Sequence, residues 1–163
     1  MKRIQALLFA AIALCTLAPA HAQALRPFDA KSLERIRAMH AGKPFVLAFW
    51  STTCEPCRDD MKVFNAAHRR YPGLPIHLVA VDPPGERAAI ERFLKTYDPG
   101  RVSRWAFADE FSERIRYAVD PAWRGELPRT YFFDASHRVE AKSGALDGGE
   151  VELWFGKQSG ARK

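Results

Sequence analysis

The chain alternates between short apolar runs and amphipathic stretches, with turn-forming residues between them. In Phe45–Trp50 every residue is hydrophobic, as expected for a strand buried on both faces of a sheet. Residues 74–82 form a second such run, interrupted by His77. Strand runs that alternate with helical periodicity predict an α/β fold. We expect helices at 28–41, 54–71, 86–97, 111–119 and 150–155, and further strands at 101–108, 130–133 and 138–143.

The most informative stretch is residues 44–60, PFVLAFWSTTCEPCRDD, where an apolar strand leads into a Cys-x-x-Cys motif. We expect a helix to begin at Cys54, so that free N–H groups and the helix dipole favour its thiolate. Cys57 would then lie one turn further along the same face, within reach of a disulfide. Pro56 suits the first turn of a helix, because its missing N–H is not needed there. The motif therefore predicts a redox-active thiol pair.

The segment FVLAFWSTTCEPC resembles the active-site strand and turn of the thioredoxin superfamily, and CEPCRDDM resembles the periplasmic TlpA/ResA-like thiol-disulfide oxidoreductases. The resemblance implies a thioredoxin-like α/β fold, a central mixed β-sheet flanked by helices. It also implies that Cys54 is the nucleophile, that Cys57 resolves, and that the two form a disulfide without a cofactor or metal. An acidic residue at position 60 acts near the buried thiol in this group, which makes Asp60 the candidate proton acceptor. The alternative is a solvated helix acid, a role for which Asp59 is equally placed. Ala48 stands where thioredoxin has a buried aspartate.

A second part of the resemblance lies in residues 123–134, WRGELPRTYFFD, which look like the superfamily's cis-proline loop. On that basis the Leu127–Pro128 bond is cis and the loop faces the cysteine pair. The backbone of Leu127 would pair with an extended substrate strand. Trp50 and Trp123 are assigned to the same substrate-binding region, although a lone aromatic such as Trp123 is equally compatible with a place in the core.

Residues 1–22 have the features of a secretory signal, which leaves 23–163 as one thioredoxin-like domain. Lys2 and Arg3 precede an apolar run at 7–18, and residues 20–22, Ala-His-Ala, suit a cleavage site. The alternative is an uncleaved membrane anchor, but the run is short against the about 20 apolar residues that a spanning helix needs. We therefore expect export to the periplasm. A single CxxC pair has little value as a fold staple there, because closing so short a loop gains little.

The formal net charge is +6, of which Lys2 and Arg3 supply two charges. This mild excess suits a basic solvated surface. The sequence contains no run of interleaved basic and aromatic residues of the kind that binds nucleic acid. Glu55 places a negative charge beside the cysteines, which disfavours the thiolate and makes the pair more reducing. We therefore expect a monomeric disulfide reductase that acts on protein disulfides, receives electrons from a membrane thiol reductase and has cytochrome c maturation as one candidate setting. The Gly-Val-rich insert of the dedicated maturation proteins is not evident, so the client stays open.

Three other functions fit the sequence less well. A disulfide-donating oxidase would need a more stabilised thiolate, which Glu55 opposes. A metal-binding or metal-delivery protein would need more ligands than one cysteine pair and four scattered histidines after residue 22. A one-cysteine peroxidase is disfavoured because Ser51 replaces the expected threonine three residues before Cys54 and because position 47 is not proline.

Overall fold

The computed structural model describes residues 24–160, which build a six-stranded sheet in the order β1-β4-β3-β2-β5-β6. The first four strands in that order run parallel, β5 is antiparallel to β2, and β6 is antiparallel to β5. The predicted α/β class with a mixed sheet is confirmed. The strands are β1 (Arg26–Phe28), β2 (Phe45–Trp50), β3 (Ile76–Ala80), β4 (Ser103–Phe107), β5 (Arg129–Phe133) and β6 (Val139–Ser143). The helices are α1 (Ser32–Met39), α2 (Cys57–Arg70), α3 (Arg87–Thr96), α4 (Ser112–Val119) and α5 (Glu150–Gly160), with a 3₁₀ turn η1 (Pro84–Glu86).

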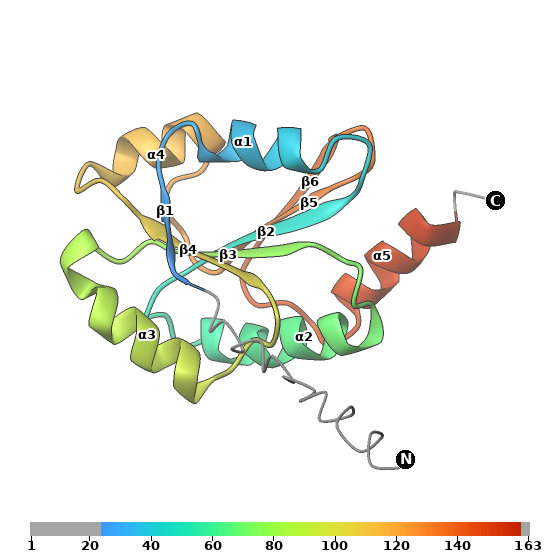
Figure 1. Cartoon of the computed structure of the whole chain (residues 1–163), viewed down its shortest axis with the longest axis horizontal. Helices are drawn as coiled ribbons and strands as arrows, with labels where there is room; N and C mark the ends of the chain where they lie inside the picture. The colour runs from blue at the N-terminus through green and yellow to red at the C-terminus, as the bar shows by residue number, and fades with distance from the viewer. Residues whose placement is uncertain (1–23, 161–163) are drawn as a thin grey trace, which may run out of the picture.

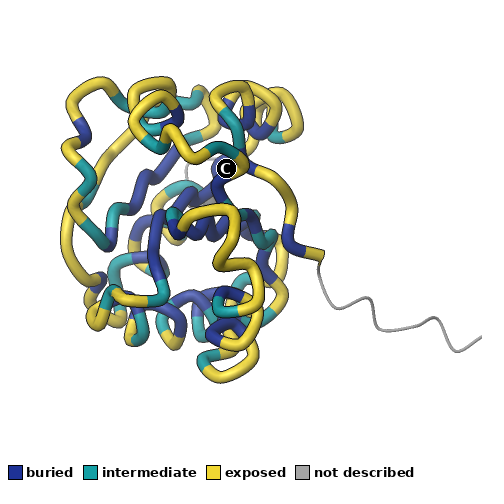
Figure 2. The backbone as a smooth tube through the Cα atoms, turned by 90° about the vertical axis from the view of Figure 1, so that its left-hand side faces the viewer, coloured by how far each residue is buried: buried dark blue, intermediate teal, exposed yellow. Residues whose placement is uncertain are grey.

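Helices cover both faces of the sheet (Figure 1): α1 and α4 lie on one side, α2 and α3 on the other, and α5 lies beside α2. Strand β2 is apolar throughout because it contributes to both layers. Val46, Ala48 and Trp50 pack in the layer of α2, α3 and α5, whereas Phe45 and Phe49 pack in the layer of α1 and α4. Figure 2 shows the buried segments in the interior, with the exposed turns around them.

The helix expected from Cys54 begins instead at Cys57, with Pro56 as its N-cap residue. Clash with the proline ring disfavours helical backbone at the preceding residue, here Glu55, which delays the helix. The first turn is closed by short-range hydrogen bonds from Arg58 N–H to Glu55 O (3.1 Å) and from Asp59 N–H to Pro56 O (3.2 Å). The Cys54 sulfur therefore belongs to the turn before the helix.

The start of the domain also differs from the prediction. Residues Arg26–Phe28 form the edge strand β1, parallel to β4, and the helix expected from 28 begins at Ser32. Pro27 is tolerated in an edge strand, where a missing N–H need not break the sheet. The expected signal at 1–22 lies outside the described residues. None of the helices formed by residues 24–160 has the length and apolar character needed to cross a membrane.

His77 is buried and hydrogen-bonded on both ring nitrogens. Its Nδ1 accepts from the indole N–H of Trp105 (3.1 Å), and its Nε2 lies 2.8 Å from Nε2 of His40. An indole can only donate, so the proton of neutral His77 resides on Nε2 and is donated to His40. Burial, His40 and Arg26 lower the pKa of His77 to about 3. In the described part of the chain, no three His, Cys, Asp or Glu side chains gather as metal ligands would.

Candidate active site

Three segments that are distant in sequence meet at one edge of the sheet. The turn at 51–56 follows the carboxyl end of β2. Because β5 is antiparallel to β2 and pairs Arg129 with Phe49, the loop at 120–128 enters at the same edge. Strand β6 pairs Ser143 with Arg129, so the segment at 144–149 leaves from this edge as well. The topology therefore places the cysteines, the cis-proline loop and the start of α5 together.

Cys54 and Cys57 are joined in a disulfide whose Cα atoms are 5.4 Å apart. Their exposure differs: Cys54 is half-buried, whereas Cys57 has no exposed surface. Cys57 is held in the core layer that also contains Met61 and Trp50. An incoming thiol or disulfide can thus reach the sulfur of Cys54 but not that of Cys57.

Asp82 holds the turn that presents Cys54. Its buried carboxylate accepts the backbone N–H of Thr52 (3.0 and 3.2 Å) and the Thr52 hydroxyl (2.5 Å). The hydroxyls of Ser51 and Thr53 hydrogen-bond across the same turn (3.1 Å). The role of Asp82 was not predicted. The available signal was an acidic residue just beyond the end of a buried strand.

Asp60 lies one helical turn after Cys57 on the buried face of α2, with 2% of its surface exposed. Its Oδ1 accepts the backbone N–H of Leu146 (2.9 Å), and no described residue hydrogen-bonds Oδ2. Burial raises the pKa of Asp60 to about 6, against the hydrogen bond from Leu146 and the charge of Lys142, which lower it. The structure therefore provides a carboxyl group that exchanges a proton near neutral pH beside the buried cysteine.

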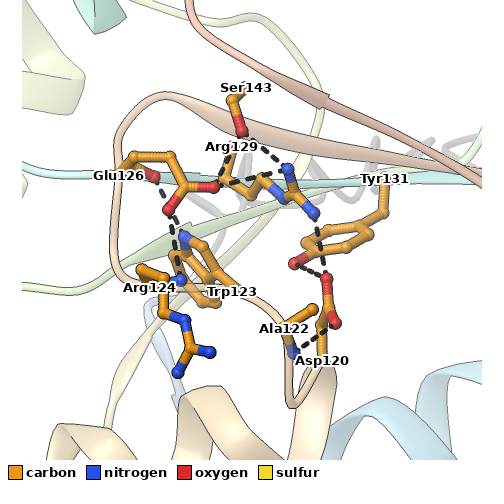
Figure 3. A network of polar contacts seen from close by, with 8 residues as sticks. All are labelled: Asp120, Ala122, Trp123, Arg124, Glu126, Arg129, Tyr131 and Ser143. Carbon is orange, nitrogen blue, oxygen red and sulfur yellow. Dashed lines mark hydrogen bonds and ion pairs between the residues drawn. The ribbon is translucent and has the colours of Figure 1, made fainter.

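The Leu127–Pro128 peptide bond is cis. A polar network clamps the loop around it (Figure 3): the Arg129 guanidinium contacts Asp120 (2.9 Å), Ser143 Oγ (2.6 Å) and Glu126 (3.4 Å). The side chain of Arg129 is only 14% exposed. Sequence reasoning missed this network, because its members come from the end of α4, the loop, β5 and the end of β6.

The two tryptophans assigned to substrate binding are core residues. Trp50 is 2% exposed and stacks on Phe93, whose ring centroid is 4.6 Å away. Trp123 is 4% exposed, packs on Phe49 at 4.6 Å, and donates its indole N–H to the carbonyl of Glu126 (3.0 Å). Trp123 therefore supports the cis-proline loop from beneath. Neither indole offers a surface to a substrate, because both rings are used in packing.

Curated relatives are named thiol-disulfide oxidoreductase ResA. The protein of Bacillus cereus is 28% identical over 103 residues, which cover 62% of this chain and 54% of the relative. That of Bacillus thuringiensis subsp. konkukian is 33% identical over 99 residues, which cover 60% and 53%. The chain thus spans about half the length of the curated relatives it matches.

Solved structures share the fold. A secreted disulfide oxidoreductase of Mycobacterium tuberculosis, described as homologous to E. coli DsbE, has a TM-score of 0.61 at 20% identity, covering 74% of this chain and 85% of that one. A thioredoxin-family thiol:disulfide interchange protein of Chlorobium tepidum has a TM-score of 0.61 at 18% identity, covering 75% and 83%. These likenesses establish a thioredoxin-like fold.

The family model described as AhpC/TSA matches residues 19–147, which include the cysteine pair, Asp60 and the cis-proline loop. The match extends over most of the chain and over the whole of the sheet. On this match and on the fold, the chain belongs to the AhpC/TSA family.

Proposed function

We propose that this protein is a thiol-disulfide oxidoreductase that reduces disulfides of exported proteins through Cys54 and Cys57. The observation that carries the proposal is the unequal burial of the pair, with a buried carboxyl group one turn beyond the inner cysteine. The ResA names of the curated relatives support the same activity.

The reaction has two exchange steps. The Cys54 thiolate attacks one sulfur of the client disulfide, forming a mixed disulfide while the other client sulfur leaves as a thiolate. The Cys57 thiolate then attacks the Cys54 sulfur, which forms the Cys54–Cys57 disulfide and releases the second client sulfur. Two electrons pass from the protein to the client. A thiol reductase in the membrane restores the dithiol.

Asp60 is the proton acceptor in the second step. Residues three apart on a helix have their Cβ atoms about 5–6 Å apart, so the Cys57 thiol and the Asp60 carboxylate are neighbours. With a pKa of about 6, Asp60 is mostly ionised at neutral pH and still basic enough to take up the thiol proton. Its Oδ2, which no described residue hydrogen-bonds, is the oxygen available for that proton.

The charges around Cys54 support this direction of electron flow. Glu55 is exposed and adjacent to Cys54, and the Asp82 carboxylate lies beneath the preceding turn. Both disfavour a thiolate at Cys54, which makes the dithiol the stronger reductant.

The site of action is the periplasm, from the signal features of residues 1–22, either as a free domain after cleavage or on an uncleaved anchor. The clients are exported proteins that form disulfides, among which the apocytochrome c thiol pair is one candidate. We expect the protein to act as a monomer and without a bound cofactor.

The roles of the two cysteines are tested by trapping. A Cys57→Ala variant should accumulate a mixed disulfide through Cys54 with a disulfide-bonded peptide, detected by mass spectrometry. The matched Cys54→Ala variant should trap little, because Cys57 is buried. Trapping through Cys57 instead would overturn the assignment.

The direction is tested by the reduction potential of the pair, measured by equilibration with glutathione or dithiothreitol buffers. A value near or below about −230 mV is expected for a reductase. A value near about −120 mV, the range of strong periplasmic oxidants, would make the protein a disulfide donor and reverse the proposed reaction.

A further inference from the structure

The segment between β6 and α5, residues 144–149, contacts both the cis-proline loop and Asp60. We call it the strap. Gly144 donates its backbone N–H to the carbonyl of Pro128 (2.9 Å), the cis-proline itself. Two residues later, Leu146 donates its N–H to Oδ1 of Asp60 (2.9 Å). One short stretch of backbone therefore contacts both the cis-proline loop and the buried Asp60 carboxylate.

The strap is closed at its base by one ion pair. Nζ of Lys142, at the end of β6, lies 2.5 Å from Oε1 of Glu150 and also contacts Oε2. Glu150, in the first turn of α5, accepts the backbone N–H of Asp147 (2.6 Å). Asp147 in turn accepts the N–H of Gly149 (2.9 Å). Lys142 and Glu150 thus fix the two ends of the strap relative to each other, with Leu146 between them.

The strand register also shows on which face of the sheet the Lys142 side chain lies. It is paired with Thr130 across β5 and β6, and directly opposed residues of an antiparallel pair project from the same face. Thr130 is two residues beyond Pro128 and is fully buried. Thr130 pairs in turn with Ala48, which packs in the layer of α2, so the Lys142 side chain is on the face of the sheet against which α2 packs.

We propose that Lys142 is a positioning residue for Asp60: paired with Glu150, it holds the strap so that Leu146 stays bonded to the Asp60 carboxylate and Gly144 stays bonded to the cis-proline loop. The strap then holds both the buried Asp60 carboxylate and the cis-proline loop. The role of Asp60 as a proton acceptor rests on the proposed function. The ion pair and the two backbone hydrogen bonds that hold the strap do not depend on that function.

Two matched variants separate this support from a simple effect of charge. Asp60 is influenced by Lys142 from β6, Glu150 from α5 and Asp59 from α2. If charge alone mattered, Lys142→Met would raise the Asp60 pKa and Glu150→Met would lower it. If the pair holds the strap, both variants release Leu146. The Leu146 hydrogen bond lowers the Asp60 pKa more than the Glu150 carboxylate raises it, so both substitutions should then raise the pKa.

The experiment is a ¹³C NMR titration of the Asp60 carboxyl carbon in the oxidised protein, assigned with Asp60→Asn. We expect upward shifts of the Asp60 pKa in both methionine variants and a wild-type value in Lys142→Arg, which keeps the pair. The control is Lys62→Met, which removes a lysine from an exposed ion pair on the same helix and should leave the Asp60 pKa unchanged. Shifts in opposite directions, or none, would overturn the proposal.

Amide hydrogen exchange tests the second contact of the strap. In Lys142→Met, the Gly144 and Leu146 amides should lose protection together, by at least tenfold, while the amides of β3 keep theirs. Loss at Leu146 alone would contradict the shared support. Neither measurement depends on catalytic activity, so a failed reductase assay and a failed strap can be told apart.

Discussion

Replacing Asp60 by asparagine should stabilise the oxidised protein at high pH relative to low pH. The folded-state pKa of Asp60 is about 6, above its ordinary value of 3.8, because burial penalises the charged form. Below pH 3.8 the carboxyl group is protonated in both states. As the pH rises through about 6, the folded state must accept a buried charge that the unfolded chain holds in water, so stability is lost across this window.

The size of the effect follows from the pKa difference. One pKa unit corresponds to about 1.4 kcal/mol, so the whole window is worth about 3 kcal/mol, of which about 2 kcal/mol falls between pH 4 and pH 8. Asparagine has the same shape, can still accept the Leu146 N–H, and carries no charge at either pH. Its pH-independent cost cancels when the two pH values are compared.

The assay is urea unfolding of the oxidised wild type and of Asp60→Asn at pH 4 and pH 8. The stability of the variant relative to wild type should increase by about 2 kcal/mol between the two. Asp134→Asn is the control: against desolvation, the hydrogen bond and charge of Arg138 lower the pKa of the Asp134 carboxyl group, so its difference from wild type should move in the opposite direction. A constant difference for Asp60→Asn, within about 0.5 kcal/mol, would refute a desolvated carboxylate, and a decrease would indicate a stabilising ion pair.

Three further outcomes are expected. Asp60→Asn should slow thiol-disulfide exchange at neutral pH and flatten its pH dependence near 6, and an unchanged rate profile would exclude the role of proton acceptor. The contribution of His77 to wild-type stability should fall by about 2 kcal/mol between pH 8 and pH 5, because unfolded His77 binds a proton below pH 6.5 that folded His77 excludes until about 3. In urea unfolding, the stability of His77→Phe relative to wild type should therefore rise by about 2 kcal/mol from pH 8 to pH 5, and an unchanged difference would place the effect elsewhere. Asp82→Ala should cost about 2 kcal/mol at pH 7, because the N–H and hydroxyl of Thr52 lose their acceptor. Asp82→Asn should cost less in the same denaturation assay, and equal losses would contradict a hydrogen-bonding role.

The fold was predictable where local pattern determines structure. Phe45–Trp50 is buried on both faces, and its composition allows few alternatives to a central strand. Strand β1 could not be predicted in this way, because three residues that include a proline carry no periodicity. The tryptophans show a related limit. Nothing local distinguishes a groove-lining indole from a buried one, and Trp123 is buried because Phe49 and the Glu126 carbonyl are its partners.

The site was predictable only in part, for the same physical reason. Cys54, Cys57 and Asp60 lie within seven consecutive residues, so local structure brings them together: Cys54 lies in the turn before α2, and Cys57 and Asp60 lie one turn apart on the helix. Two of the groups that act on Asp60, Lys142 and Leu146, come from distant elements, and the Leu146 N–H that hydrogen-bonds its carboxylate is 86 positions away in sequence. Such contacts are created by strand order, which no local pattern reveals.

The two outer strands have a consequence for how the sheet can meet another chain. Strand β1 has three residues, one of them the proline Pro27, which has no N–H to offer a neighbour. Strand β6 is largely exposed and carries Glu140 and Lys142, whose charges disfavour the pairing of a further strand along this edge. Both borders are therefore poor templates for aggregation through edge pairing. If the protein reduces protein disulfides as proposed above, these two strands would let it meet extended segments of a client without pairing with them along the border of the sheet.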